Sequence, residues 1–482
     1  MLVIAIGAFL RLYGLNAMEF KGDERESLLL AQQLIADHPW SSSAPFPAYG
    51  LISSNGVGNA PLFTWIIAAL WAVTHHPVTL TVAIALLNIL ALFPLWRWAR
   101  RRVDEFRALM TLAVVAFSPF FVLFSRKIWA PDFMLAALLL VLWSVEWWRD
   151  ARPWRASTLL LLAVLVVGQL HQSGPIAFAL LPIAVVAQVL FDRSRGMRLP
   201  PWPPPTRMEL VAIVALVLLN IFFWLPHLRY LMTLPVETLA RRPTSDTVFP
   251  EMLRKIALQI VPTDLFYFFD PHRFPFIYGD WRRWSYAAAI YTGVPLLVYG
   301  MWRWLRAPFS LPVLGVWWLS IVTAFAVTRI LTHPYYLMIL APLTAVVPAG
   351  AFDSNTLHVW VRRGLGAVRI AYVLSMLVLS ASTLMWLVER GGAAGEYGVA
   401  YSTRESQARY LASGVWRSES RTAPSKCGSI PSEIAWLANW MAPSRVQDDD
   451  SIVLCEDWIE NANGDLVYEW RFASKQRATE QK

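Results

Sequence analysis

Apolar residues along the chain are gathered into long blocks that are separated by short polar or basic segments. The blocks have 16 to 24 residues, and a helix needs about 20 apolar residues to cross a hydrocarbon core of about 30 Å. Inside a bilayer the backbone must satisfy its own hydrogen bonds, so each block is expected to be a helix. The pattern predicts about eleven transmembrane helices, at residues 1–16, 78–96, 108–124, 132–148, 156–171, 174–191, 208–226, 286–302, 310–328, 335–351 and 365–388.

The composition excludes a soluble enzyme and a disordered chain. Apolar residues make up 56% of the 482 residues, charged residues 16%, and the mean hydropathy is +0.44, whereas soluble domains usually carry about a quarter charged residues. The arginines stand between the predicted spans and form no stripe on a soluble domain, so no nucleic acid is expected as a partner. We therefore expect an all-α polytopic membrane protein surrounded by membrane lipids.

Basic residues set the expected orientation, because cytoplasmic loops carry an excess of Lys and Arg. With the N-terminus inside, the arginine-rich segments 97–107, 149–155 and 192–207 all lie inside. The block 61–74 is too short to cross and is predicted to be an interfacial helix. The expected location is the cell (plasma) membrane, with a cytoplasmic N-terminus. The first block, 1–16, is short for a span, and both a short helix and a start that lies too late stay open.

Three long segments are then expected outside, namely the loops 17–77 and 227–285 and the tail. The last 94 residues hold 14 acidic and 11 basic side chains, a net charge of −3, whereas the rest of the chain carries +12. The predicted domains are a transmembrane catalytic domain, residues 1–388, and a small extracytoplasmic α+β domain, residues 389–482.

Both cysteines of the chain, Cys427 and Cys455, lie in this tail. Cysteines that are absent from the spans and paired in an exported segment favour one disulfide. Two unpaired thiols are the alternative.

The first outside loop opens on two acidic residues, Asp23 and Glu24. Asp23 followed by Glu26 fits a capping box at the start of a helix. The second interpretation is a general base that takes a proton from a hydroxyl acceptor, and the two are compatible. Ionisable residues are otherwise rare in the spans, Arg11 being the main exception, which favours chemistry at the outer face over a path across the membrane.

A second polar cluster joins one predicted span to the next. Ser118-Pro119 breaks the first span near its outer end, Arg126 and Lys127 are expected at the membrane surface, and Asp132 begins the next helix. One interpretation is a pair of basic side chains that extend to the surface, with an acid at a helix N-terminus. The other is a cationic site for a lipid phosphate, facing an acid.

A third cluster lies late in the chain, at the expected outer edge of a span. It contains Arg329, His333, Tyr335 and Tyr336, and His171 lies at another outer end. Interfacial tyrosines are ordinary in membrane proteins, and a lone histidine is more often packed than a ligand. The sequence has no zinc motif and no glycine-rich phosphate loop, which disfavours a nucleotide-binding fold.

In this order the clusters resemble the GT-C superfamily of integral-membrane glycosyltransferases, which includes the protein O-mannosyltransferases and the lipid A aminoarabinose transferase. Its members begin with one span and an outside loop that opens on an acidic pair. An interfacial helix near a proline, an SP…SR segment before an acidic span start, and a late H-x-YY segment follow. The resemblance covers about residues 1–390, and the residues that match it are Asp23, Glu24, Pro61, Ser118, Pro119, Ser125, Arg126, Asp132, His333, Tyr335, Tyr336 and Pro342.

The resemblance implies a polyprenyl-phosphate-linked sugar donor and a lipid, glycan or protein acceptor. Asp23 would deprotonate the acceptor hydroxyl beside Glu24, the hydroxyl would attack the anomeric carbon with inversion, and cations would stabilise the leaving lipid phosphate. The residues expected to bind the donor phosphate or sugar are Arg126, Lys127, Asp132, His171, Arg329, His333 and Tyr335.

One position departs from the superfamily pattern. The aminoarabinose transferase has a lysine just before the proline, thought to contact the donor phosphate, whereas Asn59-Ala60 precede Pro61 here. Arg241, Arg242 and Arg273 of the long loop are the next candidates for that contact.

Two other classes stay open. One is a flippase or transporter of lipid-linked sugars without transferase activity, and the other is a membrane scaffold that displays the tail. Few charges in the spans and no evident inverted repeat count against a transporter. Nothing in the sequence requires a cofactor, although an acidic pair could hold a divalent metal. The sugar, hexose or pentose, and the acceptor stay open.

Overall fold

The structure is a computed structural model in which two compact units are distinguished. Unit 1 is Met1–Leu12, Ser27–Asp264 and Trp284–Ser380, and unit 2 is Tyr13–Glu26, Leu265–Arg283 and Ala381–Lys482. The predicted domains 1–388 and 389–482 stay a prediction, and the compact units add two earlier segments to the tail. The structure describes residues 1–36, 49–52, 57–150, 152–170, 174, 186, 189–190, 192–194, 196, 203–235, 248–263, 265, 269, 282–306, 319–320, 322–323, 338, 340–353, 357–393, 397–413, 427–441, 452–460 and 466–474.

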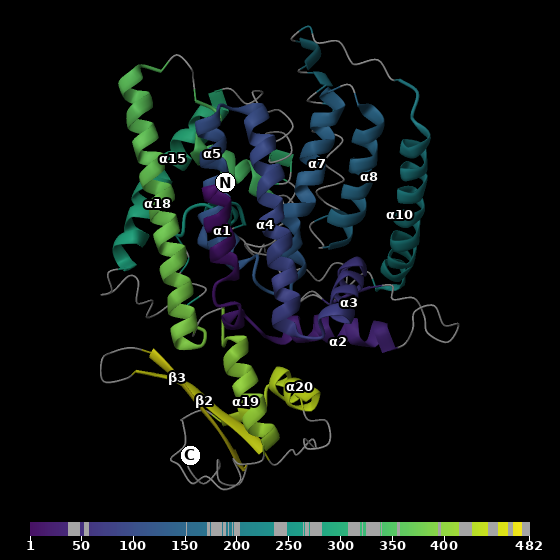
Figure 1. Ribbon diagram of the computed structural model, residues 1–482, viewed down its shortest axis with the longest axis vertical. Coiled ribbons are helices and arrows are strands. Elements are labelled where there is room, and N and C mark those ends of the chain that lie inside the picture. The colour runs from purple at the N-terminus through teal and green to yellow at the C-terminus, as the bar shows by residue number, and fades with distance from the viewer. Residues whose placement is uncertain are drawn as a thin grey trace. The chain divides into compact units, whose positions relative to one another are not determined.

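Among the described residues of unit 1, the secondary-structure elements longer than an isolated bridge are helices (Figure 1). Each of the helices α2, α15 and α18 has one end in unit 2, and the other helices given in the next sentence lie in unit 1 alone. Their bounds are α1 Leu2–Leu12, α2 Gly22–Ala36, α3 Leu62–Thr74, α4 Pro77–Arg102, α5 Glu105–Phe117, α6 Pro119–Leu123, η2 Ala130–Phe133, α7 Met134–Arg149, α8 Pro153–Leu170, α10 Arg207–Thr233, α12 Val248–Leu258, α15 Arg282–Arg306, α17 Ala341–Ala349 and α18 Val359–Arg390.

Among the described residues, five helical segments are long and apolar enough to cross a membrane: α4, η2 with α7, α8, α10 and α18. The prediction of several apolar spanning helices is thereby confirmed, and the protein is a multi-pass membrane protein. The number eleven stays a prediction, because the blocks 174–191 and 310–328 lie mostly outside the described residues.

The helices of unit 1 differ in how deeply they are buried. The most apolar window of α7 is 72% buried, whereas that of α10 is 6% buried. Helix α7 packs against α4 and α8, and α8 packs against α10. The exposed apolar face of α10, with Leu218 and Ile221, is therefore suited to contact lipid, and α7 forms part of the interior.

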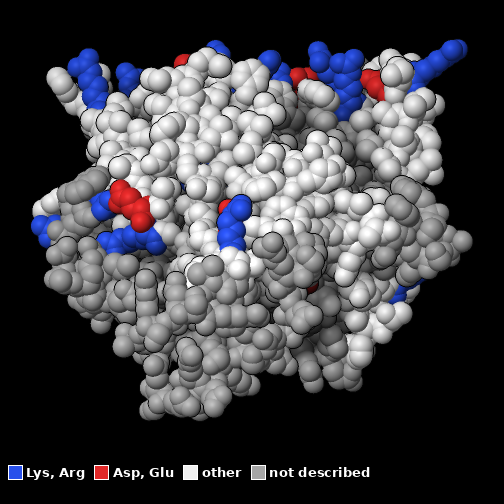
Figure 2. Space-filling model, turned by 60° about the horizontal axis from the view of Figure 1, so that its bottom comes forward, with Lys and Arg blue, Asp and Glu red and all other residues white. Residues whose placement is uncertain are grey.

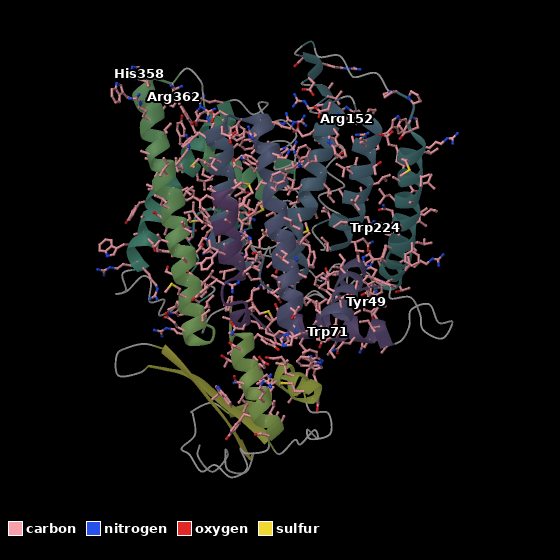
Figure 3. All side chains as sticks on the ribbon, viewed as in Figure 1. Tyr49, Trp71, Arg152, Trp224, His358 and Arg362 are labelled. Atoms are coloured by element: carbon pink, nitrogen blue, oxygen red, sulfur yellow. The ribbon has the colours of Figure 1, made fainter. Side chains whose placement is uncertain are left out.

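Basic side chains gather at one end of unit 1. Figure 2 shows a band of Lys and Arg along one edge of the molecule. Arg152 and Arg362 lie at this end of unit 1, whereas Tyr49 and Trp71 lie at the other (Figure 3). The first two belong to segments predicted inside and the last two to the first predicted outside loop, so the alternation of loops agrees with the sequence. Which end faces the cytoplasm stays a prediction.

Unit 2 contains the described strands. Strands β1 Cys427–Ser429, β2 Ile452–Glu460 and β3 Leu466–Ser474 form an antiparallel sheet in the order β1-β2-β3. Two helices, α19 Tyr401–Ser413 and α20 Ser432–Met441, pack against each other. The register pairs Cys427 with Cys455. The side chains of both cysteines lie outside the described residues, so the disulfide stays a prediction. The register is compatible with it, because paired residues of antiparallel strands have Cα atoms about 4.5–5.5 Å apart.

Candidate functional site

The acidic pair lies at the first turn of α2, which begins at Gly22, and this segment belongs to unit 2. The backbone N–H of Lys21 donates to Glu24 Oε2 at 2.9 Å, as the third helical residue does in a capping box. The predicted capping by Asp23 with Glu26 is therefore wrong, because the helix begins two residues earlier than expected. Glu24 is 2% exposed and serves the helix start. Asp23 is exposed at the second helical position, where the negative charge of a carboxylate interacts favourably with the helix dipole.

The helix break at Ser118-Pro119 is the centre of the second cluster, as the sequence predicted. Helix α5 ends at Phe117, and α6 begins at Pro119. Proline has no N–H, so it cannot donate to the carbonyl of Val115, four residues earlier. Arg11 of α1 donates instead, from Nη2 to Val115 O and from Nη1 to Ala116 O, both at 3.0 Å. Arg11 is fully buried and thus satisfies carbonyls that the break leaves without a donor.

Two hydroxyl groups complete the break. Ser380 of α18 donates to Phe117 O at 2.6 Å, and Ser118 donates to Gln259 O at 2.6 Å. Close packing of α1 on α5 brings Arg11 within reach, because a Cβ at Gly7 would lie 3.1 Å from Ala116 Cβ. The break is therefore held by side chains of α1 and α18 and by a backbone carbonyl of the segment after α12.

Arg126 and Lys127 are buried, with 3% and 8% of their surfaces exposed, so the interpretation of basic side chains that extend to the surface is wrong. Their depth in the membrane stays a prediction. Arg126 Nη1 donates to Leu10 O at 3.4 Å, beside Arg11 on α1. The Lys127 ammonium lies 4.5 Å from the ring centre of Phe124 and 4.4 Å from that of Trp129. Cation–π contacts and backbone carbonyls thus offset part of the cost of burying these charges.

Asp132 is fully buried in the same segment. Its Oδ2 accepts a hydrogen bond from the backbone N–H of Lys127 at 3.1 Å. Asn88 of α4 donates to the backbone carbonyl of Asp132 at 2.8 Å. Asp132 therefore closes the turn that carries Arg126 and Lys127, and α4 anchors it.

Four predicted site residues, namely His171, Arg329, His333 and Tyr335, lie outside the described residues, as do Tyr336, Arg241, Arg242 and Arg273. The sequence reasoning noted Arg11 but did not place it in the site, and it missed Asn88. The sequence did contain a signal for Arg11 and Asn88, since each is a polar residue within an apolar helix. Within the described part of the chain, no group of three or more His, Cys, Asp or Glu side chains could hold a metal.

These features define a multi-pass membrane protein with a broken helix and a buried cationic segment in unit 1, and with a small unit that holds the acidic pair and a sheet. The fold is similar to that of ArnT from Cupriavidus metallidurans in the apo state, with a TM-score of 0.52 at 15% identity over 91% of this chain and 84% of that chain. The same protein bound to undecaprenyl phosphate gives a TM-score of 0.50 at 13% identity over 93% and 86%.

ArnT is a GT-C glycosyltransferase, so the resemblance found in the sequence is confirmed at the level of the fold. The oligosaccharyltransferase AglB from Archaeoglobus fulgidus gives a TM-score of 0.44 at 14% identity, over 91% of this chain and 63% of that chain. No family model and no curated protein matches the sequence.

Proposed function

We propose that this protein is a glycosyltransferase that moves a sugar from a polyprenyl-phosphate donor to a hydroxyl acceptor at the outer face of the membrane. The observation that carries the proposal is the buried segment with Arg126 and Lys127, in a fold whose relative ArnT was solved with undecaprenyl phosphate. Buried cations in an apolar setting suit a lipid-linked phosphate, because their attraction to it is weakly screened there.

The proposed reaction forms one bond and breaks one bond at the anomeric carbon. Asp23 takes the proton of the acceptor hydroxyl, and the oxygen attacks the anomeric carbon with inversion. The bond from that carbon to the phosphate oxygen breaks, and polyprenyl phosphate leaves with the electron pair. Arg126 and Lys127 stabilise the negative charge that develops on the phosphate, and Asp132 keeps their segment in its turn. His171, Arg329, His333 and Tyr335 remain candidates for binding the donor.

The contacts of unit 2 support the predicted topology. Tyr397, which follows α18, donates to the carbonyl of Ala17, which follows α1. This contact supports a topology in which both residues lie on the same side of the membrane. An even number of crossings must therefore separate residues 17 and 397. The ten predicted spans from 78–96 to 365–388 satisfy this condition. If α3 also crossed, the number would be odd, which favours an interfacial α3.

The test is a donor assay with the purified protein in lipid nanodiscs. The protein is incubated with a panel of undecaprenyl-phosphate-linked hexoses and pentoses and with candidate glycan, lipid and peptide acceptors. The expected result is consumption of one donor, with release of undecaprenyl phosphate and transfer of its sugar. Movement of a labelled donor across a vesicle bilayer with no sugar transfer would instead identify a flippase and refute the transferase.

A further inference from the structure

The segment that leads into the acidic pair is joined to the start of the tail by contacts within unit 2. The phenol of Tyr397 donates to Ala17 O at 2.6 Å, and the backbone N–H of Tyr401 donates to Met18 O at 2.9 Å. Between them, Glu19 and Ala400 form an antiparallel bridge. The tail therefore pairs with residues 17–19 in the manner of a short strand.

Aromatic packing fixes the next residue, Phe20, which is fully buried. The ring centre of Phe20 lies 5.3 Å from that of Tyr401 in an edge-to-face arrangement, and 6.1 Å from that of Trp436 of α20. Such pairs add to the free energy gained by burial. Burial raises the pKa of Tyr401 above the ordinary range of tyrosine, so its phenol stays neutral. Phe20 thus ties the acidic segment to both tail helices.

A tight turn of the tail lies against Lys21. Gly398 has a φ of +73°, and a Cβ there would lie 2.7 Å from Lys21 Cε. A positive φ favours glycine, because a side chain is strained in that region. Lys21 in turn pairs with Glu19 at 2.8 Å, and its backbone N–H is the donor to Glu24. The contacts therefore run without interruption from the tail to the first turn of α2.

We propose that the tail is the positioning element of the acidic pair, and that Tyr397 is a positioning residue that acts through Ala17 on Asp23. The proposal has a positional part, the contact of the tail with the acidic segment, and a kinetic part, its effect on the rate of transfer. Only the kinetic part rests on the proposed function. A general base must be held within hydrogen-bond reach of its proton, and a displacement of about 1 Å can lower a rate by about 10²-fold. Because Asp23 is exposed and Glu24 is buried, the tail fixes the segment and leaves the first carboxylate at the surface.

The positional part is tested by cross-linking, which needs no substrate. The double variant Glu19→Cys with Ala400→Cys is oxidised mildly in nanodiscs, and the linked peptides are identified by mass spectrometry. Paired residues of an antiparallel bridge have Cα atoms about 4.5–5.5 Å apart, within the range for a disulfide. We expect cross-linking of this pair and none of the control pair Glu19→Cys with Ser406→Cys. Absence of the first cross-link, or equal yields, would overturn the proposal.

The kinetic part uses Tyr397→Phe, which removes one hydroxyl and keeps the ring that contacts Phe269. With an undecaprenyl-phosphate-linked sugar as probe, we expect kcat to fall about 5- to 10-fold and the donor KM to stay within about two-fold. The control is Tyr410→Phe, a tyrosine of α19 whose ring contacts Trp470 of β3; it should keep the wild-type kcat. A normal kcat in Tyr397→Phe would overturn the positioning role even if cross-linking succeeds.

Failure of the proposed function gives a different result. If Asp23→Asn transfers sugar at the wild-type rate, Asp23 is not the base. The proposal that the tail acts on catalysis through Asp23 is then refuted as well. If no sugar of the panel is transferred, hydrogen exchange of the backbone amides tests whether Tyr397 positions the acidic segment. Residues 17–26 should exchange at least about five-fold faster in Tyr397→Phe than in Tyr410→Phe, because opening exposes their backbone amides. Equal exchange in the two variants would refute the proposal.

Discussion

In unit 1, Arg11, Arg126 and Lys127 are buried and contact backbone carbonyls and aromatic rings, whereas in unit 2 Asp23 is exposed at the first turn of a helix. The cations were expected near the surface, and the acid was expected to cap its helix. The structure instead gives the capping contact to Glu24. These three cations are thus enclosed by protein in unit 1, whereas the carboxylate of Asp23 lies at a surface of unit 2.

The difference teaches how a membrane protein can keep buried charges. A proline-broken helix exposes carbonyls that carry partial negative charge, and Arg11 supplies the donors that they lack. The break and the cation therefore stabilise each other, so neither is expected to be tolerated alone. Asp23 is exposed at the surface of unit 2, where water can solvate its charge.

The largest effect is expected from Arg11→Leu, which removes the buried cation from the helix break. The carbonyls of Val115 and Ala116 lose their donors, and each unsatisfied buried polar group costs about 1–3 kcal/mol. The free energy of unfolding should fall by about 2–6 kcal/mol, measured by thermal unfolding in detergent. The control is Arg97→Leu, an exposed arginine of α4. Equal stability of the two variants would show that the break does not depend on Arg11.

Asp23→Asn should lower the rate of sugar transfer by about 10²-fold or more, because an amide cannot take a proton at neutral pH. The fold should be unchanged, since asparagine has nearly the same shape as aspartate and stays polar. The measurement is turnover with a polyprenyl-phosphate sugar, and the matched control is Glu26→Gln, which lies one turn further along α2. If Asp23→Asn turns over normally while Glu24→Gln is inactive, the two carboxylates have the opposite roles.

Reduction of the predicted Cys427–Cys455 bridge should destabilise unit 2 alone. A closed loop of about 28 residues corresponds to about 3 kcal/mol on the chain-entropy model. Hydrogen exchange of the strands β1 to β3 should increase after reduction, while that of α4 and α7 stays constant. Thiol labelling that is the same before and after reduction would show that no bridge exists.

The smallest effect is expected from Arg126→Gln and Lys127→Gln, tested singly. Each removes one cation from the proposed phosphate site and leaves a shorter, uncharged polar side chain, so the donor KM should rise about ten-fold, equivalent to about 1.4 kcal/mol. Arg101→Gln, which pairs with Asp150 at the basic end, should leave KM unchanged. A wild-type KM in both variants would show that Arg126 and Lys127 do not bind the phosphate, and residues such as Arg329 would become the candidates.

Local sequence determined where the helices lie and where one of them breaks. Apolar blocks predicted α4, α7, α8, α10 and α18, because burial in lipid selects for length and hydropathy alone. Ser118-Pro119 predicted the break for an equally local reason, namely the missing N–H of proline. The predicted start of α2 was wrong by two residues, because Asp23 and Lys21 compete for the cap position and the contact of Glu24 with Lys21 decides between them.

Only the tertiary structure decided which charges are enclosed and what holds the acidic pair. Arg11 finds its carbonyls about a hundred residues along the chain, and Tyr397 reaches Ala17 across nearly the whole chain. No local pattern records such pairs, since the desolvation of an arginine or the position of a carboxylate depends on what packs around it. The sequence alone determined that this is a multi-pass membrane protein with an acidic pair after its first helix. Packing determined that Arg11, Arg126 and Lys127 are buried and that the tail contacts the segment leading into that pair.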